Sequence, residues 1–139
     1  MADPMDRYPN LAPLKREPHP SELSFFKENP HVGGMATEDN RVILNPYAPL
    51  SDPERNAVAL NEAARVFMRT QDFRPAFNLT PDQSASLFGT AYGVDPQAAR
   101  ETIAARILTN DPSGGTPTGD QAAYAKALAN ALRGWWPSE

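Results

Sequence analysis

Hydrophobic residues recur with a helical period over much of the chain, and the longest such stretch runs from residue 51 to residue 69. Its apolar positions fall on one helical face: Ala57, Leu60, Ala64, Phe67 and Met68. Ser51 and Glu54 have the spacing of a capping box, and Pro53 lies in the first turn, where its missing N–H does no harm. We therefore expect this helix to be the central one of the fold.

Other helices are indicated by similar start signals. Thr80 and Gln83 form a second capping-box pattern, which predicts a short helix ending at Phe88-Gly89. Asp95-Pro96 predicts a helix that closes at residues 110–112, and Thr116-Pro117 leads into an alanine-rich helix that stops at Gly134. A shorter helix, capped by Ser21, should end at Asn29-Pro30. The pattern predicts a mainly α fold of four to five short helices in a single domain, residues 21–139.

Strand chemistry dominates only between residues 32 and 46. Gly33-Gly34 precedes a short apolar run, residues 38–40 are turn-forming, and residues 41–45 hold the β-branched Val42 and Ile43 before Pro46. This predicts a β-hairpin. A lone two-stranded ribbon is only marginally stable in water, so we expect it to pack on the helices or to extend a partner's sheet through its exposed edge.

The first 20 residues form a proline-rich arm. Six of the fifteen prolines lie within the first thirty residues, so this stretch cannot form a long helix or a regular sheet. Single apolar residues, Tyr8, Leu11 and Leu14, stand between the prolines. Two interpretations remain open: a disordered tail, or an extended strap outside the core whose apolar residues enter pockets on a neighbouring protein. On the second interpretation, the helical domain would fold without residues 1–20.

Three aromatic residues complete the candidate partner-binding set. Phe25 and Phe26 cannot face the same side of a helix, so one should enter the core and the other should meet the arm or a partner, and Phe26 is our candidate. Trp135 and Trp136 follow the last helix. Either one indole covers that helix, or the pair anchors an interface, since tryptophan is enriched among binding hot spots. The partner-binding candidates are Tyr8, Leu11, Leu14, Phe26, Trp135 and Trp136.

Charge and composition narrow the function classes. The formal net charge is −4 and both signs are spread along the chain, whereas nucleic-acid binding needs clustered Lys and Arg, so no direct nucleic-acid contact is expected. The absence of cysteine excludes disulfides, thiolate metal sites and cysteine nucleophiles. No apolar run approaches the roughly 18–20 residues of a membrane span or forms a leader, so we expect a protein made in the cytoplasm without a membrane partner.

No catalytic motif is complete. A strand followed by a helix with Asn61, Glu62 and Arg65 resembles the zincin layout, in which two histidines one turn apart bind zinc and a glutamate activates water. Here Asn61 is a poor zinc ligand and Arg65 would repel the metal, which leaves Glu62 as a solvated glutamate paired with Arg65 or Arg69. We therefore expect no enzyme activity, no cofactor and no metal.

The run NPHVGGMATEDNRVILNPY at residues 29–47, followed by NEAAR at residues 61–65, resembles small uncharacterised proteins encoded by tailed bacteriophages. The resemblance reaches from about residue 25 to residue 111 and carries no catalytic residues. It implies a structural role in a capsid, a head-to-tail connector or a tail. The leading hypothesis is a non-enzymatic virion protein, present in many copies, that binds other subunits of the assembly. The alternative is an adaptor or inhibitor of a single host protein.

Overall fold

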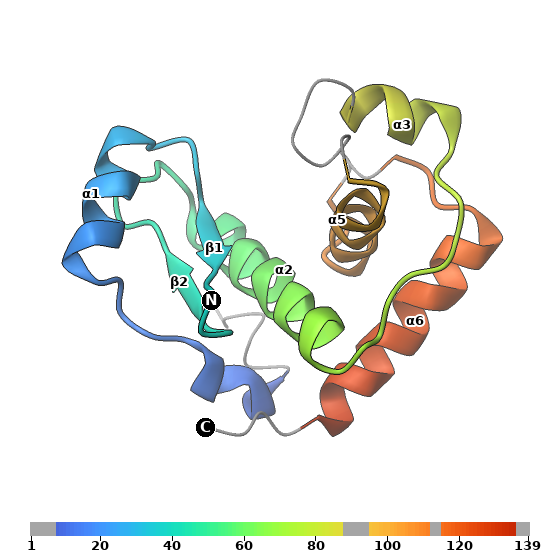
Figure 1. Ribbon diagram of the computed structural model, residues 1–139, viewed down its shortest axis with the longest axis horizontal. Coiled ribbons are helices and arrows are strands. Elements are labelled where there is room, and N and C mark those ends of the chain that lie inside the picture. Colours follow the sequence, from blue (N-terminus) through green and yellow to red (C-terminus); the bar gives the residue numbers. More distant parts are fainter. Residues whose placement is uncertain (1–7, 88–94, 112–114, 136–139) are drawn as a thin grey trace.

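The helix predicted from residue 51 is the centre of the fold (Figure 1). Ser51 N–H donates to Glu54 Oε1 and Glu54 N–H donates to Ser51 Oγ, both at 3.3 Å, so the predicted capping box is confirmed. From this cap, helix α2 runs over Asp52–Thr70. The hairpin packs on one side of α2, and helices α5 (Pro96–Leu108) and α6 (Gly119–Gly134) pack on the other.

The computed structural model describes residues 8–87, 95–111 and 115–135. Within these ranges the protein is mainly helical, with one antiparallel hairpin, and both features confirm the predicted fold class. The elements around α2 are, in chain order, the 3-10 helix η2 (Pro9–Leu14), α1 (Pro20–Glu28), β1 (Gly34–Ala36), β2 (Val42–Leu44), α3 (Pro81–Leu87), α5 (Pro96–Leu108) and α6 (Gly119–Gly134).

The hairpin pairs β1 with β2 in the register Gly34 to Leu44, Met35 to Ile43 and Ala36 to Val42. Its turn contains Asn40, whose φ of 59° lies in the left-handed region that asparagine tolerates. On the far side of β2, the arm forms a parallel bridge from Lys15 to Val42. The arm therefore covers the outer edge of β2 and leaves the outer edge of β1 without a strand neighbour in the described chain.

The buried surface of α2 is wider than a single stripe. Leu60, Ala64, Phe67 and Met68 are buried as predicted, whereas Ala57 is only partly covered. Further positions are also buried because α2 is covered on two sides: Ala59, Ala63 and Val66. Small residues here allow the neighbouring elements to approach closely.

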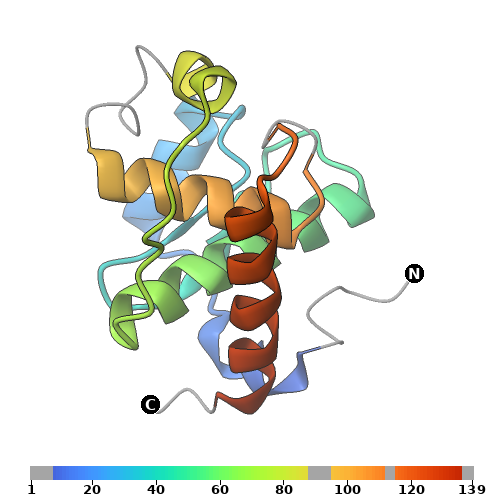
Figure 2. The same ribbon diagram turned by 90° about the vertical axis from the view of Figure 1, so that its right-hand side faces the viewer.

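Residues 8–14 of the N-terminal arm do not stay outside the core, and this corrects our expectation; residues 1–7 lie outside the described part of the chain. Tyr8, Leu11 and Leu14 are 6%, 0% and 3% exposed and belong to the main hydrophobic cluster. The Asn10 amide donates to the backbone carbonyls of Leu132 and Trp135. Figure 2 shows η2 lying against the C-terminal end of α6. This part of the arm belongs to the domain because its apolar side chains are buried in the same hydrophobic cluster as residues of α2 and α6.

A pair of glutamines joins α3 to α6 inside the protein. Gln83 and Gln121 are each the last residue of a capping box, started by Thr80 and Thr118 respectively. Their side-chain amides donate to each other at 2.8 Å, and Gln121 also donates to the Asn78 carbonyl. Both glutamines are buried, and this exchange satisfies their polar atoms.

Helix α1 differs in detail from its prediction. It is capped at His19 and not at Ser21, and the His19 N–H donates to the Glu22 carboxylate at 2.7 Å. Phe26 is fully buried and Phe25 is 44% exposed. One phenylalanine does enter the core, but it is Phe26, so the aromatic side chain that remains available to a partner is Phe25.

Candidate functional site

The hairpin run at residues 29–47 and the helical run at residues 61–65 meet at one place on the surface. Residues 32–36 of the hairpin lie against residues 58–65 of α2, and two adjoining cavities of about 660 and 470 Å³ open there. Four residues line both cavities: Val32, Gly34, Glu62 and Arg65. We call this region the hairpin cleft. The C-terminal end of α5 closes the larger cavity and its N-terminal end closes the smaller.

Glu62 links α2 to the hairpin. Its side chain is 16% exposed, and its carboxylate lies 3.8 Å from Arg65 Nε. It also accepts a hydrogen bond from the backbone N–H of Ala36 on β1. Burial nevertheless raises the pKa of Glu62, because the loss of solvation outweighs the attraction of Arg65 and Arg69. The expected pairing with Arg65 is present, but Glu62 is not the solvated glutamate that we predicted.

Arg65 and Asn61 occupy the positions that histidines hold in the zincin motif. Arg65 Nε donates to Asn61 Oδ1 at 3.1 Å, so these two side chains bind each other. In the described residues, no three His, Asp or Glu side chains gather as a metal ion would require. Glu101 on α5 lines the smaller cavity, and burial raises its pKa against the attraction of Arg65 and Arg69.

Gly33 and Gly34 bring the hairpin close to α2. A β-carbon at Gly33 would lie 3.0 Å from Val58 Cγ2 of α2, and one at Gly34 would lie 3.0 Å from Val58 Cγ1 and 2.7 Å from the Ile43 carbonyl oxygen of β2. A larger residue at either position would force α2 or β2 to shift. The two glycines therefore fix the depth of the cleft as well as the approach to β1.

The connection from α1 into the hairpin is held by Asn45, which the sequence did not single out. Asn45 is fully buried, and its amide donates to the carbonyls of Phe26, Asn29 and Val32. Its Oδ1 accepts from the Tyr47 N–H at 2.8 Å. Only the position of Asn45 at the end of a strand, next to Pro46, could have hinted at this role.

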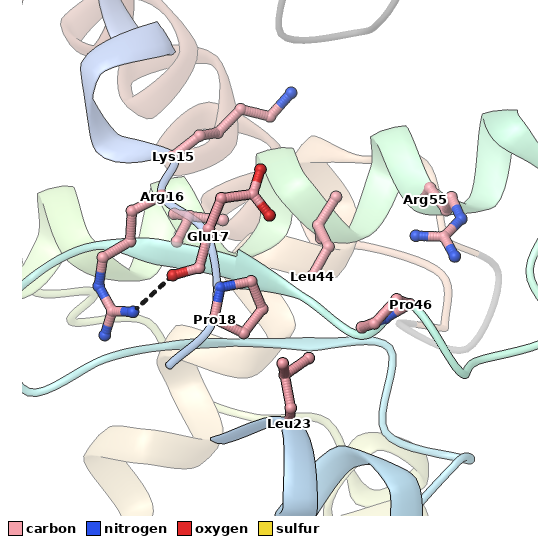
Figure 3. Close-up of a pocket in the computed structure, with 9 residues that line it drawn as sticks. Lys15, Arg16, Glu17, Pro18, Leu23, Leu44, Pro46 and Arg55 are labelled. Carbon is pink, nitrogen blue, oxygen red and sulfur yellow. Dashed lines mark hydrogen bonds between the residues drawn. The ribbon is translucent and has the colours of Figure 1, made fainter. Parts of the chain in front are cut away.

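A second groove of about 580 Å³ lies on the other edge of the hairpin, between the arm, α1 and β2 (Figure 3). Leu23, Val42 and Leu44 contribute apolar surface, and Arg55 lies at one end. Arg16 crosses this region and donates to the Glu17 carbonyl, to Glu22 and to Asp39. Arg16 thereby ties the arm to α1 and to the hairpin turn.

The predicted partner-binding residues do not form one surface. Tyr8, Leu11, Leu14 and Phe26 are buried within this chain, which corrects their assignment as contacts available to a partner. Trp135 is partly buried and stacks edge-on against Phe67, with ring centroids 5.1 Å apart. The Trp135 indole therefore packs on the core through α2. Trp136 lies outside the described residues.

Comparison with protein-family models, with curated proteins and with solved structures finds no match. None of the helices described in the structure has both the length and the apolar content needed to span a lipid bilayer. What bears on the function of the candidate site is therefore its geometry. That geometry combines an unpaired strand edge, two adjoining cavities, partly buried carboxylates and arginines, and an exposed aromatic ring beside them.

Proposed function

We propose that the protein is a non-enzymatic structural subunit of a large protein assembly, with a phage virion as the leading candidate, and that it contacts a neighbouring subunit through the hairpin cleft. The observation that carries this proposal is the outer edge of β1, which opens onto the cleft and has no strand neighbour in the described chain. Uncovered strand edges pair readily with other chains unless something protects them.

The position of Phe25 also indicates that the hairpin cleft is the contact surface. It is 44% exposed and lines the smaller cavity, so its ring can be buried by a partner that covers the strand edge. Aromatic side chains beside a polar rim are typical of interface centres. Tyr47 is similarly exposed, at 47%, but lines neither cavity of the cleft. The two rings therefore make a matched pair for a test.

Mass spectrometry of purified particles and native complexes, combined with substitutions, tests the proposal. We expect the chain to be present in many copies per particle, Phe25→Ala to reduce its incorporation severalfold, and Tyr47→Ala to leave incorporation unchanged. A chain that is absent from particles and instead copurifies at one to one with a single cellular protein would overturn the proposal in favour of an adaptor or inhibitor. Equal effects of the two substitutions would show that the cleft is not the contact surface.

A further inference from the structure

The outer edge of β1 presents backbone N–H and C=O groups with which an extended peptide can form hydrogen bonds. Asn45 N–H donates to the Gly33 carbonyl and Thr37 N–H donates to the Arg41 carbonyl, so these residues face β2. Because bonding alternates along an antiparallel strand, Gly34 and Ala36 direct their N–H and C=O groups to the other edge. Glu62 already accepts the Ala36 N–H, which leaves Gly34 at the centre of the open edge.

Space for a peptide exists on this edge. Gly34 lines both cavities of the hairpin cleft, and it has no side chain to hold an incoming backbone away. An extended segment paired with β1 would direct its successive side chains to opposite faces, and cavities of about 660 and 470 Å³ adjoin the edge. A compact ligand without a peptide backbone would leave the Gly34 groups unused.

The charges around the cleft favour a basic occupant. Its two cavities are lined by five carboxylates and three guanidinium groups, which gives a formal charge of −2 there: Glu54, Glu62, Asp95, Glu101 and Asp111 against Arg65, Arg69 and Arg106. Burial raises the pKa of both Glu62 and Glu101 even though arginines lie near them. A further cation brought by a partner would offset the lost solvation of these carboxylates.

We propose that β1 takes up an extended segment of a partner protein as an added strand, and that a lysine or arginine of this segment is seated against Glu62 and Glu101. Main-chain hydrogen bonds to the Gly34 edge would supply affinity, and the buried carboxylates would select the basic side chain. This inference rests on the proposed function, since it names the chemistry of the neighbour that occupies the hairpin cleft.

Selection of a displayed library of random ten-residue segments on the full-length chain tests the inference. We expect enriched segments to share one Lys or Arg within an alternating, strand-forming pattern that lacks proline. A synthetic peptide of the enriched sequence should bind at least tenfold more tightly than the same peptide with Glu at the basic position. Methylation of alternate backbone nitrogens should abolish its binding, because a strand needs those N–H groups.

Three charge-neutralising variants then locate the site. Glu101→Gln and Glu62→Gln should each weaken binding of the selected peptide about tenfold, whereas Glu38→Gln, an equal charge change at an exposed position of the hairpin turn, should not. Circular dichroism and thermal melting confirm that each variant is folded. Absence of any enriched basic segment, or equal effects of Glu38→Gln and Glu101→Gln, would overturn the inference.

Failure of this inference can be told apart from failure of the proposed function. If the chain is abundant in particles and Phe25→Ala impairs its incorporation, but no basic segment is selected, the hairpin cleft is still an interface and only its occupant is misidentified. If the chain is absent from particles but a basic strand binds with the expected dependence on Glu62 and Glu101, strand addition holds and the assembly role is wrong.

Discussion

Two ionic clusters lie on opposite edges of the hairpin, and the fold shifts the pKa values of their carboxyl groups in opposite directions. In the arm cluster, beside β2, Arg16 lies 2.8 Å from Glu22 and 3.2 Å from Asp39. In the cleft cluster, beside β1, Glu62 and Glu101 lie near Arg65 and Arg69. Hydrogen bonds lower the carboxyl pKa values in the arm cluster, whereas burial raises those in the cleft cluster against the attraction of Arg65 and Arg69.

The opposite pKa shifts indicate that the arm cluster is a structural contact and that the cleft cluster is a candidate site. Hydrogen bonds from Arg16 lower the pKa of Glu22 to about 2, and the Thr37 hydroxyl, followed by Arg16, lowers the pKa of Asp39 to about 2. The ionised forms of these two carboxyl groups are therefore more stable in the folded state than in the unfolded chain. For Glu62 and Glu101 the folded state disfavours the charge, because burial raises their pKa values, and carboxyls with shifted pKa values in a cleft are candidates for functional sites.

The largest expected effect comes from the arm itself. Leu11 is fully buried, so Leu11→Ala should lower the free energy of unfolding by about 2–5 kcal/mol, as truncation of a core leucine does. Urea denaturation measures this change. Leu23→Ala is the control, because Leu23 is only partly buried beside the arm, and it should cost about 1 kcal/mol. If Leu11→Ala costs no more than Leu23→Ala, the arm is not part of the core.

A smaller effect is expected from the arm cluster. Arg16→Ala should lower the free energy of unfolding at pH 7 by up to about 1 kcal/mol, because it removes the charged hydrogen bonds to Glu22. It also removes the contact of Arg16 with the exposed Asp39. Since the folded pKa values of these carboxyls lie below their ordinary ones, the contribution is present above pH 4.5 and fades as pH falls towards 2. Urea denaturation at several pH values follows this loss.

Arg74→Ala is the control for the arm cluster. Arg74 lies 2.9 Å from Asp72, but both side chains are largely exposed, so the substitution should change stability little at any pH. Equal pH profiles for the Arg16 and Arg74 variants would contradict a structural role of the arm cluster.

The smallest effect on stability is expected from Glu62→Gln, and it should be a gain and not a loss. Glu62→Gln keeps an acceptor for the Ala36 N–H and removes a charge that burial disfavours, so stability at pH 7 should be unchanged or rise by less than about 1 kcal/mol. The folded pKa of Glu62 is raised, so any gain should shrink as pH falls and the native carboxyl becomes protonated. Thermal melting across pH measures it. A marked loss of stability at pH 7 would show that the Glu62 charge is structural.

Local signals in the sequence were sufficient for most of the helices and for the hairpin. The pairs Ser51 with Glu54 and Thr80 with Gln83 lie within one turn, so their capping hydrogen bonds depend on few other residues. Ala36 and Val42 flank a turn at residues 37–41 that contains turn-forming residues. These features can be predicted because the physical interaction joins neighbours in the chain.

The arm and the cleft could not be predicted in this way because they depend on distant contacts. Asn10 binds a carbonyl 122 residues away, and nothing in the proline-rich sequence indicates that partner. Glu62 becomes buried only when β1 folds across α2, and a helical pattern alone leaves it on a polar face. Phe25 and Phe26 are adjacent and chemically identical, so only the packing of α1 decides which of them is exposed.

Hydrogen–deuterium exchange, measured on the free chain and on the chain in its native assembly, distinguishes an arm that belongs to the fold from an arm that docks on a partner, and it shows whether the hairpin cleft is the contact surface. We predict that η2 and the bridge at residues 15 and 16 are protected already in the free chain. Assembly should add protection chiefly at residues 33–37 and at Phe25. An arm that exchanges freely in isolation and becomes protected on assembly, with β1 unchanged, would contradict the account.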